Sequence, residues 1–215
     1  MIKARGVVFI KHPSVDSVPS VRNFYKQGEN MSEYKLKKEL RVAISGKSGC
    51  GNTTVSTMLA EKLGIKLINY TFRQLAAEKG LTLAQVIENA KNDDSYDVAV
   101  DTHQVALAQA EPCVLGSRLA IWMLKEADVK VYLIASDDTR AKRILNREGG
   151  DLQQIKDFTA MRDREDSARY MKLYQIDNNE YEFADLKIDT ATRTPEMIVE
   201  MILDYLEKRD FIEKK

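Results

Sequence analysis

The feature that most constrains this chain is a glycine-rich loop between an apolar strand and an amphipathic helix. The run LRVAIS, typical of a buried strand, leads into GKSGCGNTT at residues 46–54. The segment TVSTMLAEKLG follows with apolar residues at helical spacing, and it ends at Gly64, a residue common at helix C-termini. Small residues let successive N–H groups of such a loop point inward, and the helix adds its positive N-terminus. The unit therefore predicts a phosphate-binding site.

The loop departs from the usual pattern G-x-x-x-x-G-K-[ST] at one position. Gly46, Gly51 and Thr53 are in register, but Asn52 occupies the position of the lysine. An amide carries no charge, and charge-assisted hydrogen bonds are about twice as strong as neutral ones. Lys47 follows the first glycine. Its side chain either folds back over bound phosphates or remains a solvated loop lysine, and the residues leave both interpretations open.

The loop also predicts which residues bind ATP. Its backbone N–H groups surround the phosphates, and the Thr53 hydroxyl is placed to contact Mg²⁺ as the metal ligand. For Cys50, a small loop residue is the favoured interpretation and a redox role is the alternative. The ATP-binding residues expected from the loop are Gly46, Ser48, Gly49, Cys50, Gly51, Asn52, Thr53 and Thr54.

Short apolar runs and helical segments alternate along the rest of the chain. The further strands expected are KLIN, CVLG, VKVYLIA and ADLKIDT. The helices expected between and after them are TFRQLAAEKG, TLAQVIENAKND, residues 96–110, RLAIWMLKEA, a segment capped by Ser136 and ended by Gly149, residues 151–174, and a last helix opened by Thr194 and Pro195. This alternation predicts an α/β fold with a buried parallel sheet and helices on both faces. Ligands of such sheets bind at the carboxyl ends of the strands, where the glycine loop lies.

Composition limits the partners and the location. The formal net charge is zero, which gives no general attraction to nucleic acid or to an anionic membrane. No apolar run approaches the roughly 18 residues that a membrane span needs. The two cysteines, Cys50 and Cys113, lack a metal-binding spacing. We expect a cytoplasmic protein that binds neither nucleic acid nor membrane, and that is a monomer or weak homodimer.

The first 38 residues differ from the rest. The stretch KHPSVDSVPSVRNFYKQGEN is polar and shows neither helical nor strand periodicity, whereas Met31 begins a segment that reads as a natural start. We expect residues 1–38 to be a disordered arm or the product of an upstream start that is not used, with a docking arm as the less favoured alternative. The folded domain is expected over residues 39–210.

Several segments together carry a resemblance to a known family. They are ISGKSGCGNTTVSTMLAEKLG, TFRQLAAEKG, VLGSRLAIWMLKEADVKVYL, RAKRILNREGG and RDREDSARYMKLYQID. From about residue 41 to 206 the chain resembles cytidylate kinases, most closely the short archaeal-like type, within the P-loop nucleoside monophosphate kinases. The resemblance implies a P-loop NTPase fold, three layers α/β/α around a five-stranded parallel sheet, with a helical lid at about 145–175. It also implies phosphoryl transfer from ATP to CMP or dCMP, with Mg²⁺.

The resemblance assigns roles to particular residues. Arg143 and Arg147 match the arginine-rich entry to the lid and are expected to be catalytic, and Arg140 in the same stretch joins the ATP-binding set. Lys47 is also expected to be catalytic, not from the resemblance but because its charge can replace the one missing at Asn52. Positions 162, 166 and 169 also share one face of a helix, which supports their grouping independently. The residues expected to bind CMP are Arg73, Asp101, Arg118, Arg162, Asp166 and Arg169.

Two departures from the family pattern keep a second function open. Besides Asn52, the third strand lacks its usual terminal acid, because Gly116 and Ser117 occupy that place. The carboxylate that would help to hold Mg²⁺ through water is therefore absent. The alternative is a catalytically weak sensor or regulator that keeps the fold and binds nucleotide. A nucleic-acid-binding module is a third and weaker alternative, since the charge is balanced and no aromatic–basic repeat occurs.

Overall fold

The structure, a computed structural model, describes residues 32–215. Residues 1–31 of the arm expected over residues 1–38 lie outside the described residues. The strands are β1 (Tyr34–Leu36), β2 (Arg41–Gly46), β3 (Lys66–Ile68), β4 (Cys113–Gly116), β5 (Val129–Ile134), β6 (Leu186–Asp189) and β7 (Ile212–Lys214). The helices are α1 (Asn52–Leu63), α2 (Phe72–Lys79), α3 (Leu83–Ala90), α4 (Ser95–Ala110), α5 (Ala120–Met123), α6 (Asp137–Glu148), α7 (Leu152–Tyr174) and α8 (Pro195–Lys208).

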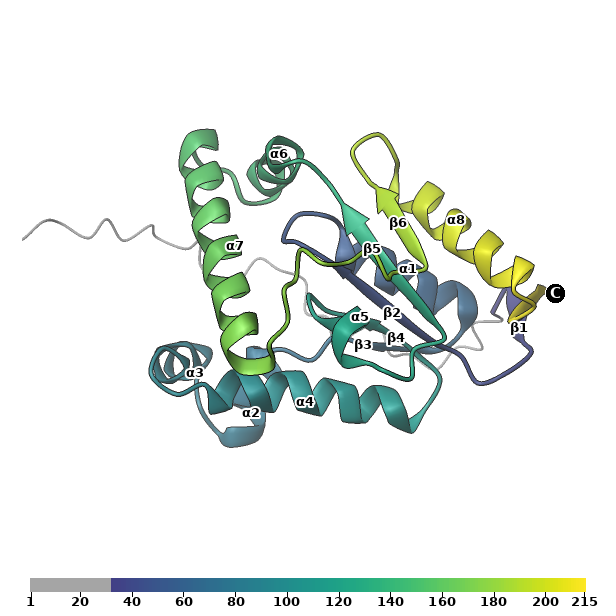
Figure 1. The fold of residues 1–215 in the computed structure, drawn as a ribbon, viewed down its shortest axis with the longest axis horizontal. Helices are drawn as coiled ribbons and strands as arrows, with labels where there is room; N and C mark the ends of the chain where they lie inside the picture. Colours follow the sequence, from purple (N-terminus) through teal and green to yellow (C-terminus); the bar gives the residue numbers. More distant parts are fainter. Residues whose placement is uncertain (1–31) are drawn as a thin grey trace, which may run out of the picture. The chain divides into compact units, whose positions relative to one another are not determined.

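Five strands form a parallel sheet in the order β3-β4-β2-β5-β6 (Figure 1). Every neighbouring pair is parallel, so the carboxyl ends of all five strands meet at one edge. The glycine loop leaves β2, the central strand, at this edge. The predicted α/β fold with a five-stranded parallel sheet is confirmed.

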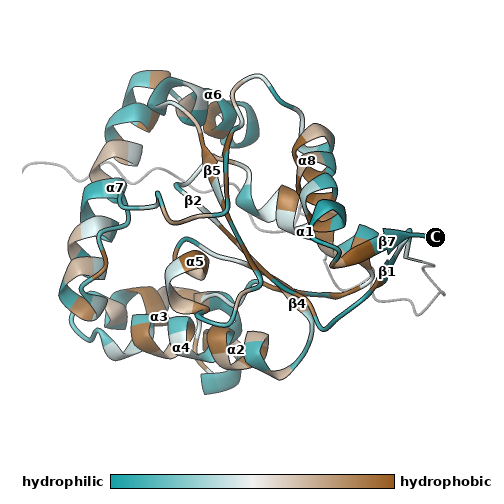
Figure 2. Ribbon diagram, turned by 45° about the vertical axis from the view of Figure 1, so that its right-hand side comes forward, coloured by the Kyte–Doolittle hydropathy of each residue, from teal (hydrophilic) through white to brown (hydrophobic). Residues whose placement is uncertain are grey.

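Two apolar layers enclose the sheet (Figure 2). Val42 and Ile44 of β2 point to a core built with α1 and α8, whereas Ala43 points to a core built with α4 and α5. The alternation of side chains along a strand sends successive residues to opposite faces. A strand that is buried on both faces must be apolar throughout, which explains the uninterrupted run that the sequence shows.

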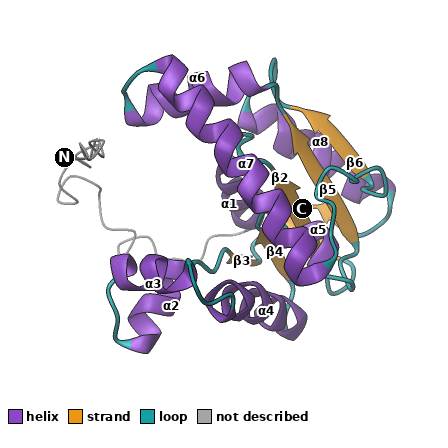
Figure 3. Ribbon diagram, turned by 60° about the vertical axis from the view of Figure 1, so that its left-hand side comes forward, coloured by secondary structure: helices purple, strands orange, loops and turns teal. Residues whose placement is uncertain are grey.

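A smaller apolar cluster joins α2, α3 and α4 outside the sheet. Leu75, Val86 and Val100 pack together with Tyr70, which follows β3. Figure 3 shows these helices on one side of the carboxyl edge and the α6–α7 pair on the other. The glycine loop therefore lies between two helical groups.

The helix boundaries that rest on capping chemistry agree with the sequence. The Ser136 hydroxyl accepts a hydrogen bond from the Thr139 N–H and begins α6, and Gly149 follows its last residue. Thr194 caps α8 in the same way, with Pro195 in the first turn. The long charged helix expected over 151–174 is present as α7.

Two expectations about elements differ from the structure. The domain extends beyond 39–210, because β1 and β7 pair as an antiparallel two-stranded sheet in which Leu36 faces Ile212. Three-residue strands give no readable alternation in a sequence. The helix expected from RLAIWMLKEA is only four residues long, α5. Three of its four residues, Ala120, Ile121 and Trp122, are buried, whereas an amphipathic helix would leave one face exposed.

Candidate active site

The backbone of the glycine loop is arranged to receive an anion. Gly49 and Gly51 have φ of 85° and 102°, values that favour glycine because a side chain would be strained there. Gly51 begins α1, and no side chain caps the first N–H groups of this helix. These uncapped donors, together with the positive end of a twelve-residue helix, form a site of the kind that binds phosphate.

Asn52 closes the loop instead of reaching out of it. Its side-chain Nδ2 donates a hydrogen bond of 2.7 Å to the carbonyl of Gly46, the first residue of the loop. The Oδ1 atom of Asn52 is buried and has no hydrogen-bond partner among the described residues. The amide therefore acts inside the loop, and the missing charge has to come from elsewhere.

A cavity of about 530 Å³ opens beside the loop and collects most of the predicted site. Four walls enclose it: the loop with the start of α1, residues 69–71, one face of α4, and residues 116–119. Arginines of α6 and α7 complete the lining. The predicted site residues that line it are Lys47, Ser48, Gly49, Gly51, Asn52, Thr53, Thr54, Asp101, Arg118, Arg143, Arg147, Arg162 and Arg169.

Lys47 is placed to supply the positive charge that Asn52 does not bring to the loop. It lines the large cavity and also a small hollow of about 10 Å³ that Asp163 and Asp166 share. Within residues 32–215 it makes no hydrogen bond or ion pair through its ammonium group that would hold it elsewhere. Its ammonium group can therefore turn toward an anion in the cavity.

Five of the predicted residues do not line this cavity. Gly46 and Cys50 are buried behind the loop, and Arg73 lies on the exposed side of α2. Arg140 is 1% exposed, so the expectation that its guanidinium faces ATP does not match its position. Asp166 is also buried, and it contacts the cavity arginines from behind.

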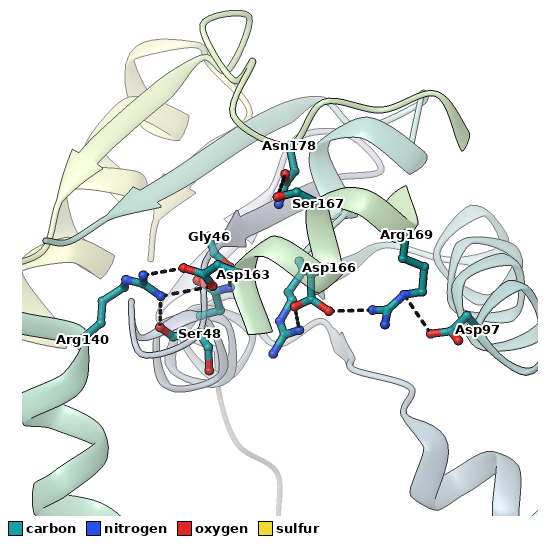
Figure 4. A network of polar contacts seen from close by, with 11 residues as sticks. Gly46, Ser48, Asp97, Arg140, Asp163, Asp166, Ser167, Arg169 and Asn178 are labelled. Atoms are coloured by element: carbon teal, nitrogen blue, oxygen red, sulfur yellow. Dashed lines mark hydrogen bonds and ion pairs between the residues drawn. The ribbon is translucent and has the colours of Figure 1, made fainter. Parts of the chain in front are cut away.

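A chain of ion pairs fixes the arginines opposite the loop (Figure 4). The Asp166 carboxylate binds Arg118 through one oxygen and Arg169 through the other, the latter at 2.7 Å. Arg169 also contacts Asp97 of α4 at 3.2 Å. Enclosure by protein, and then the charge of Arg118, lowers the pKa of Arg162. Cations that repel one another across a cavity favour an anionic ligand.

The α6 arginines differ from one another in their surroundings. Arg143 donates to the Gly49 carbonyl at 3.3 Å and to the Thr190 hydroxyl at 2.8 Å, so it braces the loop while it lines the cavity. Arg147 is largely exposed and pairs with Glu148, its neighbour. An exposed pair of this kind is weak, which leaves Arg147 free to exchange Glu148 for a phosphate.

Sequence reasoning named Asp101 of α4 but missed its neighbours on the same wall, Asp97 and Gln104. The cavity-lining residues Asp97, Asp101 and Gln104 fall at i, i+4 and i+7, a helical face that the sequence contains but that no motif marks. Tyr174 donates to Asp101 at 2.9 Å, and Gln104 Nε2 donates to it at 3.2 Å. Burial raises the pKa of Asp101 to about 6, although the hydrogen bond from Tyr174 opposes the shift.

The missing acid at the end of β4 has a steric cause. A side chain at Gly116 would place its Cβ 2.5 Å from the Ser56 hydroxyl of α1. Real Cβ atoms essentially never approach another heavy atom this closely, so a larger residue at Gly116 requires Ser56 to shift. A carboxylate at Gly116 would therefore meet the Ser56 side chain of α1.

The described residues contain no other obvious centre of chemistry. Both thiols are free and buried, and burial raises the pKa of Cys50 and of Cys113. Over residues 32–215, His, Cys, Asp and Glu side chains do not gather in threes as a metal site would require. No helix in this part of the chain combines the length and apolar character needed to cross a membrane.

The fold and the site together define a P-loop α/β protein of the kinase type, with arginines facing the loop across one cavity. Solved structures support the fold. A protein from Eubacterium ventriosum has a TM-score of 0.60 at 19% identity, covering 80% of this chain and 99% of that one. Shikimate kinase from Bacteroides thetaiotaomicron has a TM-score of 0.55 at 16% identity, covering 78% and 98%.

Sequence comparison then identifies the family. The model of the cytidylate kinase-like family matches residues 41–192, and the chain belongs to this family. It is 41% identical over 175 residues to cytidylate kinase 2 of Borreliella burgdorferi, covering 80% of this chain and 97% of that protein. It is 39% identical over 171 residues to cytidylate kinase of Archaeoglobus fulgidus, covering 78% and 95%.

Proposed function

We propose that this protein transfers the γ-phosphoryl group of ATP to CMP or dCMP, giving ADP and CDP or dCDP. One observation carries the proposal: a single cavity joins the glycine loop to the arginines of α7 and to Arg118. A kinase of this kind must hold two phosphorylated substrates with their phosphates facing each other. Membership of the cytidylate kinase-like family supports the same conclusion.

The ATP end of the cavity is formed by the loop. Its N–H groups and the start of α1 bind the β- and γ-phosphates, and Asn52 keeps the loop closed through Gly46. Lys47, Arg143 and Arg147 supply positive charge around the transferring group. Phosphoryl transfer requires mainly positioning and charge stabilisation, so these three side chains take the catalytic roles.

The CMP end is formed by α4, α7 and the turn after β4. Arg118, Arg162 and Arg169 bind the monophosphate and ribose region, and Asp101 faces them from α4. Asp166 orients Arg118 and Arg169 through its two oxygens. Arg73 is exposed on α2 and does not line the cavity, so its role stays a prediction.

The residues present fit a magnesium ion that arrives with ATP. Mg²⁺ keeps most of its waters and binds phosphate oxygens with one or two protein ligands, so a preformed cluster of carboxylates is not required. The Thr53 side chain lies at the cavity wall and would supply the protein ligand. When bound, the ion would neutralise charge that develops on the phosphate oxygens.

The location and assembly also stay predictions. A cytoplasmic location follows from the proposed substrates, ATP and CMP, which are cytoplasmic metabolites. A monomer or weak homodimer likewise stays a prediction from the sequence.

The test is an assay of ADP release coupled to NADH oxidation, run with CMP, dCMP, UMP and AMP as acceptors. We expect release with CMP or dCMP at a rate well above that without acceptor, and a lower kcat/KM with AMP. ADP release that does not depend on any monophosphate would support the sensor or regulator instead.

A further inference from the structure

Arg140 is the most deeply buried charged side chain that the proposed chemistry leaves unused. Its side chain is 1% exposed, and it does not line the cavity. A buried guanidinium is unfavourable unless its N–H groups are paired. The burial of Arg140 therefore depends on the partners of its guanidinium.

One guanidinium joins three separate parts of the chain (Figure 4). Nη1 of Arg140 donates to the carbonyl of Ser48 in the glycine loop at 3.0 Å. Nη2 contacts the Asp163 carboxylate of α7 at 2.5 Å, and Nη1 contacts its other oxygen at 3.4 Å. Nη2 also contacts Asp137 of α6 itself at 2.7 Å. The loop, α6 and α7 thus share one fork of hydrogen bonds.

The backbone of α6 presses on the loop at the same place. A Cβ added to Gly49 would lie 3.0 Å from Arg140 Cβ and 3.1 Å from its Cα. The loop consequently has little room to move unless Arg140 moves with it. Close packing of this kind transmits a displacement instead of absorbing it.

Asp163 lies beside the CMP-binding residues on α7. It follows Arg162 directly and precedes Asp166 by three residues, so any movement of α7 that brings those side chains onto CMP also moves Asp163. Asp163 also shares the small hollow with Lys47 and Asp166. The two nucleotide ends of the cavity are therefore connected behind its wall.

We propose that Arg140 and Asp163 are a positioning pair that couples the binding of the two nucleotides. The proposal rests on the proposed function. CMP fixes α7, α7 fixes Asp163, and the carboxylate holds the guanidinium against the Ser48 carbonyl, which keeps the loop N–H groups turned toward the ATP phosphates. Neither residue touches a nucleotide. Each nucleotide binds more tightly when the other is present, by the same factor in both directions.

The experiment measures this factor by calorimetry in Mg²⁺-containing buffer. The Kd of a non-hydrolysable ATP analogue is determined with and without saturating CMP, and the Kd of CMP with and without the analogue. For the wild type we expect each Kd to fall by about tenfold, within the usual range of such couplings. In Asp163→Asn the factor should approach one, while each Kd alone changes by less than about threefold.

Two further variants separate coupling from a general loss of stability. Asp137→Asn removes a carboxylate from the same guanidinium, but that carboxylate belongs to α6 and is largely exposed, so coupling should persist. Arg140→Lys keeps the charge and loses the planar fork, so it cannot hold Ser48 and Asp163 together, and coupling should fall. Arg140→Lys also serves as the second test variant if Asp163→Asn does not fold.

Several outcomes would overturn the proposal. Wild-type protein that binds both nucleotides without mutual effect contradicts the coupling alone. A coupling factor in Asp163→Asn equal to that of the wild type would show that the Arg140–Asp163 pair does not couple the two nucleotides. An equal loss of coupling in Asp137→Asn would show the same. Wild-type protein that binds no CMP contradicts the proposed function, and the coupling falls with it.

Discussion

Among single residues, Asn52 and Lys47 carry the largest difference from the usual phosphate-binding loop. Asn52 uses its amide to donate a hydrogen bond to the Gly46 carbonyl, and it brings no positive charge to the loop. Lys47 leaves the opposite limb of the same loop and lines the cavity. The lysine of this loop is therefore at position 47 instead of position 52. The proposed chemistry requires that its ammonium group still reach the γ-phosphoryl group of ATP.

Replacement of Lys47 tests this exchange. Loss of a charge that stabilises the transition state should raise the barrier by about 3 kcal/mol, a hundredfold in rate. Lys47→Ala should therefore lose most turnover and still bind ADP, and Asn52→Lys in that background should restore part of the rate. Lys208→Ala, on the exposed side of α8, is the control. Turnover of Lys47→Ala at the wild-type rate would show that Lys47 is only a solvated loop residue.

Asp101 predicts a pH dependence of stability. Its folded pKa of about 6 lies above the ordinary 3.8, so the folded state binds the proton more tightly than the unfolded state. Asp101 therefore contributes up to about 3 kcal/mol to the free energy of unfolding below about pH 4. This contribution is lost as the pH rises through 6. Asp101→Asn should consequently be more stable than wild type at pH 7.5, and the difference should shrink toward pH 4. Urea unfolding at both pH values checks this.

The control for that comparison is Asp157→Asn, an exposed carboxylate on α7 bonded only to Gln153. It should leave the pH dependence unchanged. An Asp101→Asn variant that is less stable than wild type at both pH values would show that the hydrogen bond from Tyr174 outweighs the buried charge.

Among elements, α7 contributes several charged residues to the site from a single face. Arg162, Asp166 and Arg169 lie on one face, and Asp166 is buried where it can bind two arginines at once. The face of α4 with Asp97 and Asp101 stands opposite. The proposed CMP end thus draws on α4, α7 and Arg118 after β4, and not on the glycine loop.

Asp166→Ala should therefore separate the two substrates. Without this carboxylate Arg118 and Arg169 lose their common partner, so the KM for CMP should rise about tenfold or more while the KM for ATP changes little; a tenfold rise corresponds to about 1.4 kcal/mol. Asp157→Ala, on the same helix, should leave both unchanged. Steady-state kinetics with each substrate varied in turn decides the point, and equal effects on both KM values would contradict the assignment of α7 to CMP.

The elements also show what a sequence can and cannot predict. The five strands and α7 were predictable, since continuous apolar runs, caps at Ser136 and Thr194, and the spacing 162–166–169 are local patterns. The full wall of α4 was not, because Asp97 and Gln104 belong to no motif and only Asp101 was named from the sequence. The burial of Arg140 was not predictable either, since it depends on where α7 folds back against α6.

At the scale of the whole molecule, the β1–β7 pair closes the fold far from the cavity. Ile212 is 2% exposed and joins the core formed by α1, α8 and one face of the sheet. Ile212→Ala should lower the free energy of unfolding by about 2–4 kcal/mol, the usual effect of such a truncation, and leave kcat unchanged. Lys214→Ala, exposed in the same strand, is the control in urea unfolding. A lowered kcat in Ile212→Ala would show that this end of the molecule influences the site.

The whole account depends on a phosphoryl group crossing one cavity from the loop to the arginine set. Transfer of label from γ-³²P-ATP to CMP by the wild-type protein, with products separated by chromatography, tests this most directly. We expect labelled CDP, formed in proportion to ADP, with little free phosphate because the acceptor occupies the place of water. Binding of both nucleotides without labelled CDP, or label released only as inorganic phosphate, would contradict the account.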